Sequence, residues 1–221
     1  AMQYAATFGF PVWLRPQDSF LARNGVAHDG EVAPRLGLPT IPVVAETIAL
    51  ATMLQLAKET GVKLHICRIS SAAAVEMIRT AKREGLAVTC DVSMNHVHLT
   101  EMDIGFFDAN CHIVPPLRSL RDRDALRAGL KDGTIDAVCS NHSPVDEDAK
   151  QLPFAEAEDG ATGLELLLPL VLKWAEQERV PLLDALARVT INPALLLGQK
   201  IGHLSVGAHA DICVYDPEAI W

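Results

Sequence analysis

The chain has 221 residues, of which 49% are apolar and 21% charged, and it carries a formal net charge of -9. The net negative charge argues against nucleic acid or an anionic membrane as a partner, because binding phosphates needs clustered lysine and arginine. No apolar run reaches the roughly 20 residues that span a bilayer, and no secretory signal precedes the first element, so we expect a cytoplasmic protein. The apolar content suffices for a substantial core in one large domain or two small ones.

Short apolar runs alternate with longer helical patterns, which indicates βα units and a parallel sheet. Helix-sized segments separate the first three expected strands, as right-handed crossovers require. We expect strands at residues 11–15, 63–70, 86–92 and 134–140, and helices around residues 43–60, 72–84, 122–131 and 163–178.

Three further segments have their own character. Residues 110–118, NCHIVPPLR, predict an ordered loop or an extra short strand. The acidic stretch at residues 141–159 is either a lid or binding element or a solvated insertion. Near the end of the chain, ADICVYD at residues 210–216 alternates in polarity and predicts a strand of a small sheet outside the main fold.

Three expected strands end in residues that cannot hold a catalytic metal. They are Arg15, Arg68 and Asn141. In a parallel α/β barrel the C-terminal ends of the strands carry the chemistry. A guanidinium has no lone pair for a metal, and asparagine lacks the charge of aspartate. We therefore expect neither a hydrolytic zinc site nor another metal cofactor at these positions.

A series of segments carries a family resemblance through its order and spacing. The series runs through GEVAPRLGLPTIPVVAE, LHICRIS, GLAVTCDV, PPLR, DGTIDAV, the HSP loop, GATGLELLLPL, NPALLLG and a closing G-x-L-x-V-G-x-x-A-D strand. With these segments the chain resembles the C-terminal half of a class I dihydroorotase of the amidohydrolase superfamily. The resemblance implies a distorted (β/α)8 barrel, with units five to eight in residues 1–198 and part of a small composite β-domain in residues 199–221.

The resemblance also implies that the site has degenerated. In the active family, the positions of Arg15 and Arg68 are held by metal-binding histidines, and that of Asn141 by an aspartate that also serves as the base. Two substrate-contact positions have changed as well, to Val114 and Val145. We therefore expect no catalytic residues and no zinc, although active relatives use zinc. The H-x-H ligands of the first barrel strand lie outside this chain.

Several histidines and cysteines invite functional readings. His96 and His98 form an H-x-H that could clamp a metal from one face of a strand, but no partner ligand is evident, so a structural or adventitious role is expected. His65 and Cys67 share a strand face opposite Leu64, and we expect a satisfied buried histidine under an outer helix. The five cysteines contain no C-x-x-C pair, and buried free thiols are expected.

The two arginines leave two readings open. They could replace the lost metal charge in a pseudo-site, through hydrogen bonds from Arg15 and Arg68 to inherited carboxylates. They could equally extend from the barrel mouth to water.

The resemblance favours a non-catalytic, dihydroorotase-like protein of pyrimidine biosynthesis. Such pseudoenzymes serve as structural subunits that bind and stabilise aspartate carbamoyltransferase, which is the expected partner here. The alternatives are an active dihydroorotase or related cyclic amidohydrolase, and a small-molecule sensor that uses the inherited pocket. Because half a barrel leaves two sheet edges open, we also expect a homo-oligomer.

Overall fold

A four-stranded parallel sheet is the centre of the computed structural model, which describes residues 1–217. The strand order β1-β4-β5-β6 follows the chain. All four strand predictions are confirmed, although each strand is shorter than expected. The strands are β1 (Val12–Leu14), β4 (Leu64–Ile66), β5 (Val88–Ser93) and β6 (Ala137–Cys139).

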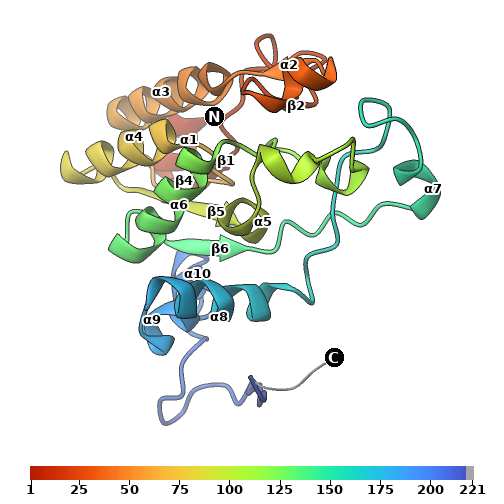
Figure 1. Ribbon diagram of the computed structural model, residues 1–221. Coiled ribbons are helices and arrows are strands. Elements are labelled where there is room, and N and C mark those ends of the chain that lie inside the picture. The colour runs from red at the N-terminus through yellow and green to blue at the C-terminus, as the bar shows by residue number, and fades with distance from the viewer. Residues whose placement is uncertain (218–221) are drawn as a thin grey trace.

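Three helices connect and cover these strands, namely α3 (Val43–Thr60), α4 (Ala72–Arg83) and α6 (Leu120–Asp132) (Figure 1). The Ser71 hydroxyl caps α4 by accepting from the Ala74 amide at 3.1 Å. A capping box between Ser119 and Asp122 starts α6. Gly61, in the left-handed conformation with φ of 67°, ends α3. These local signals fix where each crossover begins and ends.

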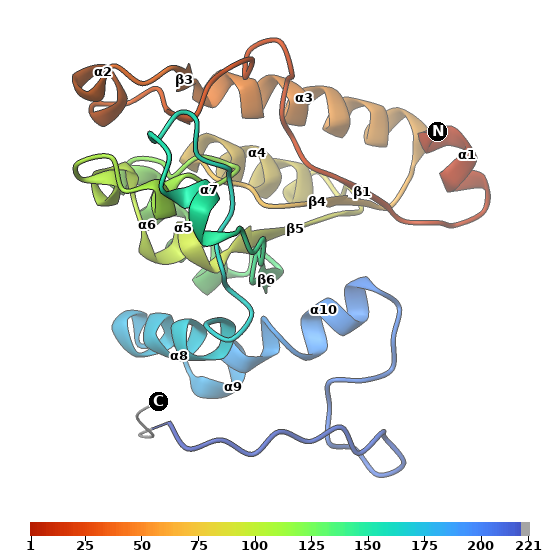
Figure 2. The same ribbon diagram turned by 90° about the vertical axis from the view of Figure 1, so that its right-hand side faces the viewer.

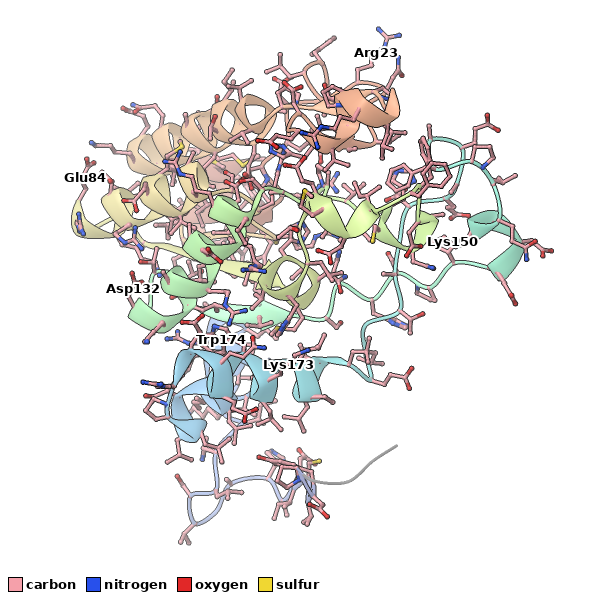
Figure 3. The ribbon with its side chains drawn as sticks, in the orientation of Figure 1. Arg23, Glu84, Asp132, Lys150, Lys173 and Trp174 are labelled. Atoms are coloured by element: carbon pink, nitrogen blue, oxygen red, sulfur yellow. The ribbon has the colours of Figure 1, made fainter. Side chains whose placement is uncertain are left out.

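The remaining elements surround this core. Helices α8 to α10 form a layer next to β6 (Figure 2), and Trp174 on α8 is fully buried in the main core (Figure 3). The elements are α1 (Met2–Thr7), β2 (Ala27–His28), α2 (Val32–Leu36), β3 (Thr40–Ile41), α5 (Met94–His98), the 3-10 helices η1 (Glu101–Ile104) and η2 (Ala109–Cys111), α7 (Glu147–Lys150), α8 (Leu167–Glu178), α9 (Leu182–Ala187) and α10 (Ile191–Leu196). Strands β2 and β3 pair in parallel as a separate two-stranded sheet.

Alternation along the strands divides the sheet into two faces. Leu64, Ile66 and Val92 belong to the core packed against the helices. Trp13, His65 and Thr89 lie in register with one another and therefore share the opposite face. We call this second face the inner face. It carries the polar side chains of the candidate site.

The predicted strand at residues 210–216 is wrong for this structure. These residues are exposed and form no strand, and the tail runs outside the layer of α8 to α10 (Figure 2). A strand needs a neighbour to pair with, and the described part of the chain offers none beside this segment. Residues 218–221, the end of the predicted β-domain segment, lie outside the described residues. Within residues 1–217, every helix is too short or too polar to cross a membrane.

Candidate functional site

The positions predicted from the sequence come together at the C-terminal end of the sheet, where the parallel strands finish. Arg68 follows β4 and Asn141 follows β6, and both adopt left-handed backbone conformations, with φ of 55° and 48°. The Arg68 guanidinium donates to Asn141 Oδ1 at 2.6 Å. The Arg68 backbone amide donates to Asp91 Oδ1 at 2.8 Å. A hydrogen bond between an arginine and an amide side chain therefore links the residues that follow β4 and β6.

Arg15 lies at the same end of the sheet, after β1, and is exposed. Partial burial and the positive charge of Arg68 lower the pKa of Arg15, and Asp159 opposes the shift. Within residues 1–217 neither Arg15 nor Arg68 forms an ion pair, so the carboxylate bonds of the pseudo-site do not form there. Arg15 instead extends to water, in line with the second reading of the two arginines.

These three positions do not fit a zinc ion. Neither arginine offers a lone pair, and the Asn141 side-chain oxygen is already engaged by Arg68. Two neighbouring positive charges would also repel a dication. No catalytic step through a metal can be built on Arg15, Arg68 and Asn141.

A polar cluster lies on the inner face, next to this end of the sheet. His65 accepts or donates at both ring nitrogens, with Nδ1 2.8 Å from Thr89 Oγ1 and Nε2 3.0 Å from Asp91 Oδ2. The prediction of a satisfied buried histidine is confirmed, but its placement under an outer helix is wrong. Register with Trp13, whose ring centroid is 4.0 Å away, puts His65 on the inner face.

Two cysteines flank the same carboxylate. Cys139 donates to Asp91 Oδ1 over 3.4 Å. Burial, with a smaller contribution from Asp91, raises the pKa of Cys67 to about 11. The ligand atoms of His65, Cys67 and Asp91 all lie within 4.8 Å of one another. Sequence reasoning missed this grouping because the residues come from two strands. The alternation of polar side chains on both strands is the signal that could have found it.

The H-x-H pair lies on helix α5, so its assignment to a strand is wrong. Ser93 ends β5 and caps the helix by accepting from the Asn95 amide. His96 Nε2 lies 3.2 Å from the Pro116 carbonyl, and His98 Nε2 lies 2.9 Å from the Leu170 carbonyl. Burial lowers the pKa of His96 to about 4. The two histidines bond different segments, and the expected structural role is confirmed.

A buried hydrogen-bond network around Arg118 and Glu46 was not foreseen. Arg118, from the PPLR segment, donates to the Ile41 carbonyl at 2.7 Å and to the Ser70 hydroxyl at 3.1 Å. Glu46 Oε1 accepts from the Ser70 amide at 2.6 Å. The network ties the ends of β3 and β4 to the segment that contains half-buried Val114. Arg118 therefore has an architectural role here.

The acidic loop at residues 141–159 is anchored from within. Phe154 is 2% exposed, and its ring stacks on His112 with centroids 5.1 Å apart. Lys150 reaches the η2 segment, where it donates to the Ala109 carbonyl at 3.0 Å (Figure 3). Val145 packs beside Gly160, whose backbone has no room for a side chain. The loop is thus anchored to the fold through Phe154, although most of its residues, including its six acidic side chains, are exposed.

Comparison with known proteins decides the family. The sequence profile of the Amidohydrolase family matches residues 30–220. The chain belongs to the amidohydrolase family. A dihydroorotase-like protein of Pseudomonas putida is 43% identical over 219 residues, and a dihydroorotase of Geobacter sp. (strain M21) is 40% identical over 221 residues. These matches cover 99% and 100% of this chain but 52% of each relative. The chain thus spans about half the length of the curated relatives it matches.

Solved structures give the same fold for this amidohydrolase chain. An L-hydantoinase of Arthrobacter aurescens superposes with a TM-score of 0.83 at 26% identity, covering 95% of this chain and 48% of that one. A D-hydantoinase of Thermus sp. superposes with a TM-score of 0.86 at 23% identity, covering 99% and 50%. The predicted α/β class and the parallel half-barrel sheet are confirmed.

Proposed function

We propose that this chain is part of a dihydroorotase-like member of the amidohydrolase family that does not hydrolyse dihydroorotate. One observation carries the proposal: Arg68 donates to Asn141 at 2.6 Å across the strand ends where active relatives would place metal ligands. A cationic side chain and a neutral amide in that place cannot bind a zinc ion or act as the base for a water molecule.

We further propose that the protein is a cytoplasmic structural subunit that binds and stabilises aspartate carbamoyltransferase. The partner rests on the family resemblance and agrees with the similarity to dihydroorotase-like proteins of Pseudomonas. The anchored acidic loop supports it, because it presents fixed negative charges to a basic partner surface. Those charges are Asp146, Glu147, Asp148, Glu156, Glu158 and Asp159.

The lack of activity is tested on the full-length protein with dihydroorotate, in the presence of added zinc and with an active dihydroorotase as positive control. We expect no turnover above the uncatalysed rate. The 40% identity to proteins named dihydroorotase makes an active enzyme the second candidate. Turnover that Arg68→Ala or Asn141→Ala reduces at least tenfold would establish that candidate instead.

The partnership is tested by co-expressing the full-length protein with the carbamoyltransferase of the same organism and separating the products by size. We expect one co-eluting complex and a transferase that survives heating longer than the transferase alone.

Changing the six loop carboxylates to amides should slow association and flatten its salt dependence more than it speeds dissociation. The control changes three exposed carboxylates outside the loop to amides, Glu59 on α3, Glu76 on α4 and Glu84 just after α4, which are distant in sequence from the loop. A transferase that never co-elutes and is equally stable alone would overturn the proposal.

A further inference from the structure

We propose that His65, Cys67 and Asp91 form a binding site for a transition-metal ion, with Zn²⁺ as the fitting ion. The site is distinct from the strand-end positions Arg15, Arg68 and Asn141, and it does not depend on the proposed lack of hydrolysis. Imidazole, thiolate and carboxylate are the three donor types that bind zinc in proteins.

The spacing of the three donors suits one ion. Their ligand atoms lie within 4.8 Å of one another, and His65 Nε2 lies 3.0 Å from Asp91 Oδ2. Metal–ligand bonds of 2.0–2.3 Å at tetrahedral angles place ligand atoms roughly 3.3–3.8 Å apart. Small side-chain rotations therefore bring the three atoms around an ion, without a change of the backbone.

Neighbouring groups already orient His65 and Asp91. Thr89 Oγ1 lies 2.8 Å from His65 Nδ1, so its oxygen can accept from Nδ1 while Nε2 faces the carboxylate. The Arg68 amide and the Cys139 thiol hold Asp91 Oδ1, which leaves Oδ2 on the side of His65. Such second partners fix the tautomer of a metal-bound histidine and the direction of a carboxylate.

The cluster carries a buried carboxylate that a cation would neutralise, against the repulsion of the nearby Arg68 guanidinium, which also acts on Cys67. Asp91 is 8% exposed, and in residues 1–217 no lysine or arginine side chain forms an ion pair with it. Two anionic ligands and a neutral imidazole would neutralise a dication in this buried place. On binding, the thiol of Cys67 loses its proton to solvent. The proton that Nε2 shares with Asp91 moves to Nδ1, and the resulting Nδ1–H donates a hydrogen bond to Thr89 Oγ1.

The test uses the full-length protein, stripped of metal by a chelator and titrated with Co²⁺ as a spectroscopic probe of zinc sites. We expect a near-ultraviolet thiolate-to-cobalt charge-transfer band that saturates at one equivalent and disappears when zinc is added. Cys67→Ala should abolish the band and weaken zinc binding at least 100-fold. Thr89→Val, which removes only the orienting hydroxyl, should weaken zinc binding about 10–100-fold.

Cys111→Ala is the matched control. Cys111 is half-buried like Cys67, burial raises its pKa to about 11 as well, and its thiol donates to the Asp103 carbonyl far from the cluster. This variant should keep the band and the zinc affinity.

No band in the unaltered protein, or a band that persists in Cys67→Ala, would overturn the site. If Cys67→Ala does not fold, as judged by circular dichroism, Cys67→Ser replaces it and should lose the cobalt band equally. Zinc held elsewhere in the protein gives no band that depends on Cys67, and dihydroorotate turnover is measured separately.

Discussion

Arg68 and Asn141 combine an unusual backbone with a short side-chain contact. Both have positive φ, at 55° and 48°. Asparagine tolerates this region, whereas for arginine it costs about 1–2 kcal/mol. The Arg68 amide on Asp91 and the Arg68 guanidinium on Asn141 offset that strain. The C-terminal end of the sheet is thus held by hydrogen bonds of Arg68 and Asn141, whose side chains cannot bind a metal ion.

Replacing the amide by a carboxylate should strengthen this contact. We expect Asn141→Asp to raise the free energy of unfolding by about 1 kcal/mol at neutral pH, because an ionised acceptor bonds a guanidinium more strongly than an amide does. Denaturant titration measures it. The gain should vanish as the pH falls below the carboxylate's pKa. An equal gain in an Arg68→Met background would show that the contact is not its source.

His96 gives the chain a calculable response to acid. Burial lowers its pKa to about 4 from 6.5, so the folded state favours the neutral ring. The unfolded chain binds the proton first, and the stability due to neutral His96 is fully present above pH 6.5 and is lost as the pH falls through 4. The difference amounts to about 3 kcal/mol between these limits.

We therefore expect His96→Gln to lose less stability than the unaltered chain between about pH 7 and pH 4.5. Glutamine keeps a donor for the Pro116 carbonyl but has no proton to gain. Thermal unfolding at a series of pH values measures the two slopes. His209→Gln, at an exposed position in the tail, controls for removing an imidazole. Parallel slopes for His96→Gln and the unaltered chain would contradict the assignment.

For single residues, the sequence predicted where a side chain lies better than which side chain it bonds. Arg15, Arg68 and Asn141 were expected at one end of the sheet because parallel strands end on the same side. The bond between Arg68 and Asn141 depends on left-handed turns that no residue pattern announces. The cluster of His65 with Asp91 depends on the register between β4 and β5, which is set by packing of the whole sheet.

Among the elements, the acidic loop at residues 141–159 depends most on a single side chain. Phe154 joins a small core with Ala27, Val32 and Ile104, next to the separate sheet of β2 and β3. We expect Phe154→Ala to lower the free energy of unfolding by about 3 kcal/mol, through lost burial and the cavity left behind. It should also speed protease cleavage within residues 146–152.

Leu152→Ala is the control from the same loop, since Leu152 is exposed. It should change the free energy of unfolding by no more than about 0.5 kcal/mol. Cleavage that is equally fast in both variants would mean that the loop is held by its backbone contacts, such as that of Gly160 with His112, and not by the aromatic ring.

Elements with long periodic patterns were predictable, and short ones were not. Helix α3 has the expected bounds because a proline precedes it and a glycine ends it. Helix α5 has five residues, and strands β2 and β3 have two each. Elements this short carry no periodicity to detect. The tail at residues 210–216 has strand alternation but is not assigned to a strand in the described part of the chain, because alternation describes a face and does not supply a neighbouring strand.

At the scale of the molecule, the sheet of residues 1–217 is open on both sides. Strands β1 and β6 each have one neighbour, so their outer backbone groups face no strand in this part of the chain. Trp13, 40% exposed, lies on the inner face beside the β1 edge, and Tyr4, Phe8 and Phe10 form an exposed aromatic group just before it. Unpaired edges and apolar patches of this kind are normally covered.

We therefore predict that the 221-residue chain, expressed alone, self-associates through the β1 edge and the inner face. Sedimentation velocity over a range of concentrations should show a monomer giving way to larger species at tens of micromolar. Trp13→Glu should weaken this association at least tenfold, because it places a charge where apolar surface would be buried. Phe106→Glu, at an exposed aromatic on the η1–η2 segment, should leave association unchanged.

A single monomeric species at all concentrations would show that the open edges do not drive pairing. Association that Phe106→Glu weakens as much as Trp13→Glu would instead place the contact on another face of the molecule.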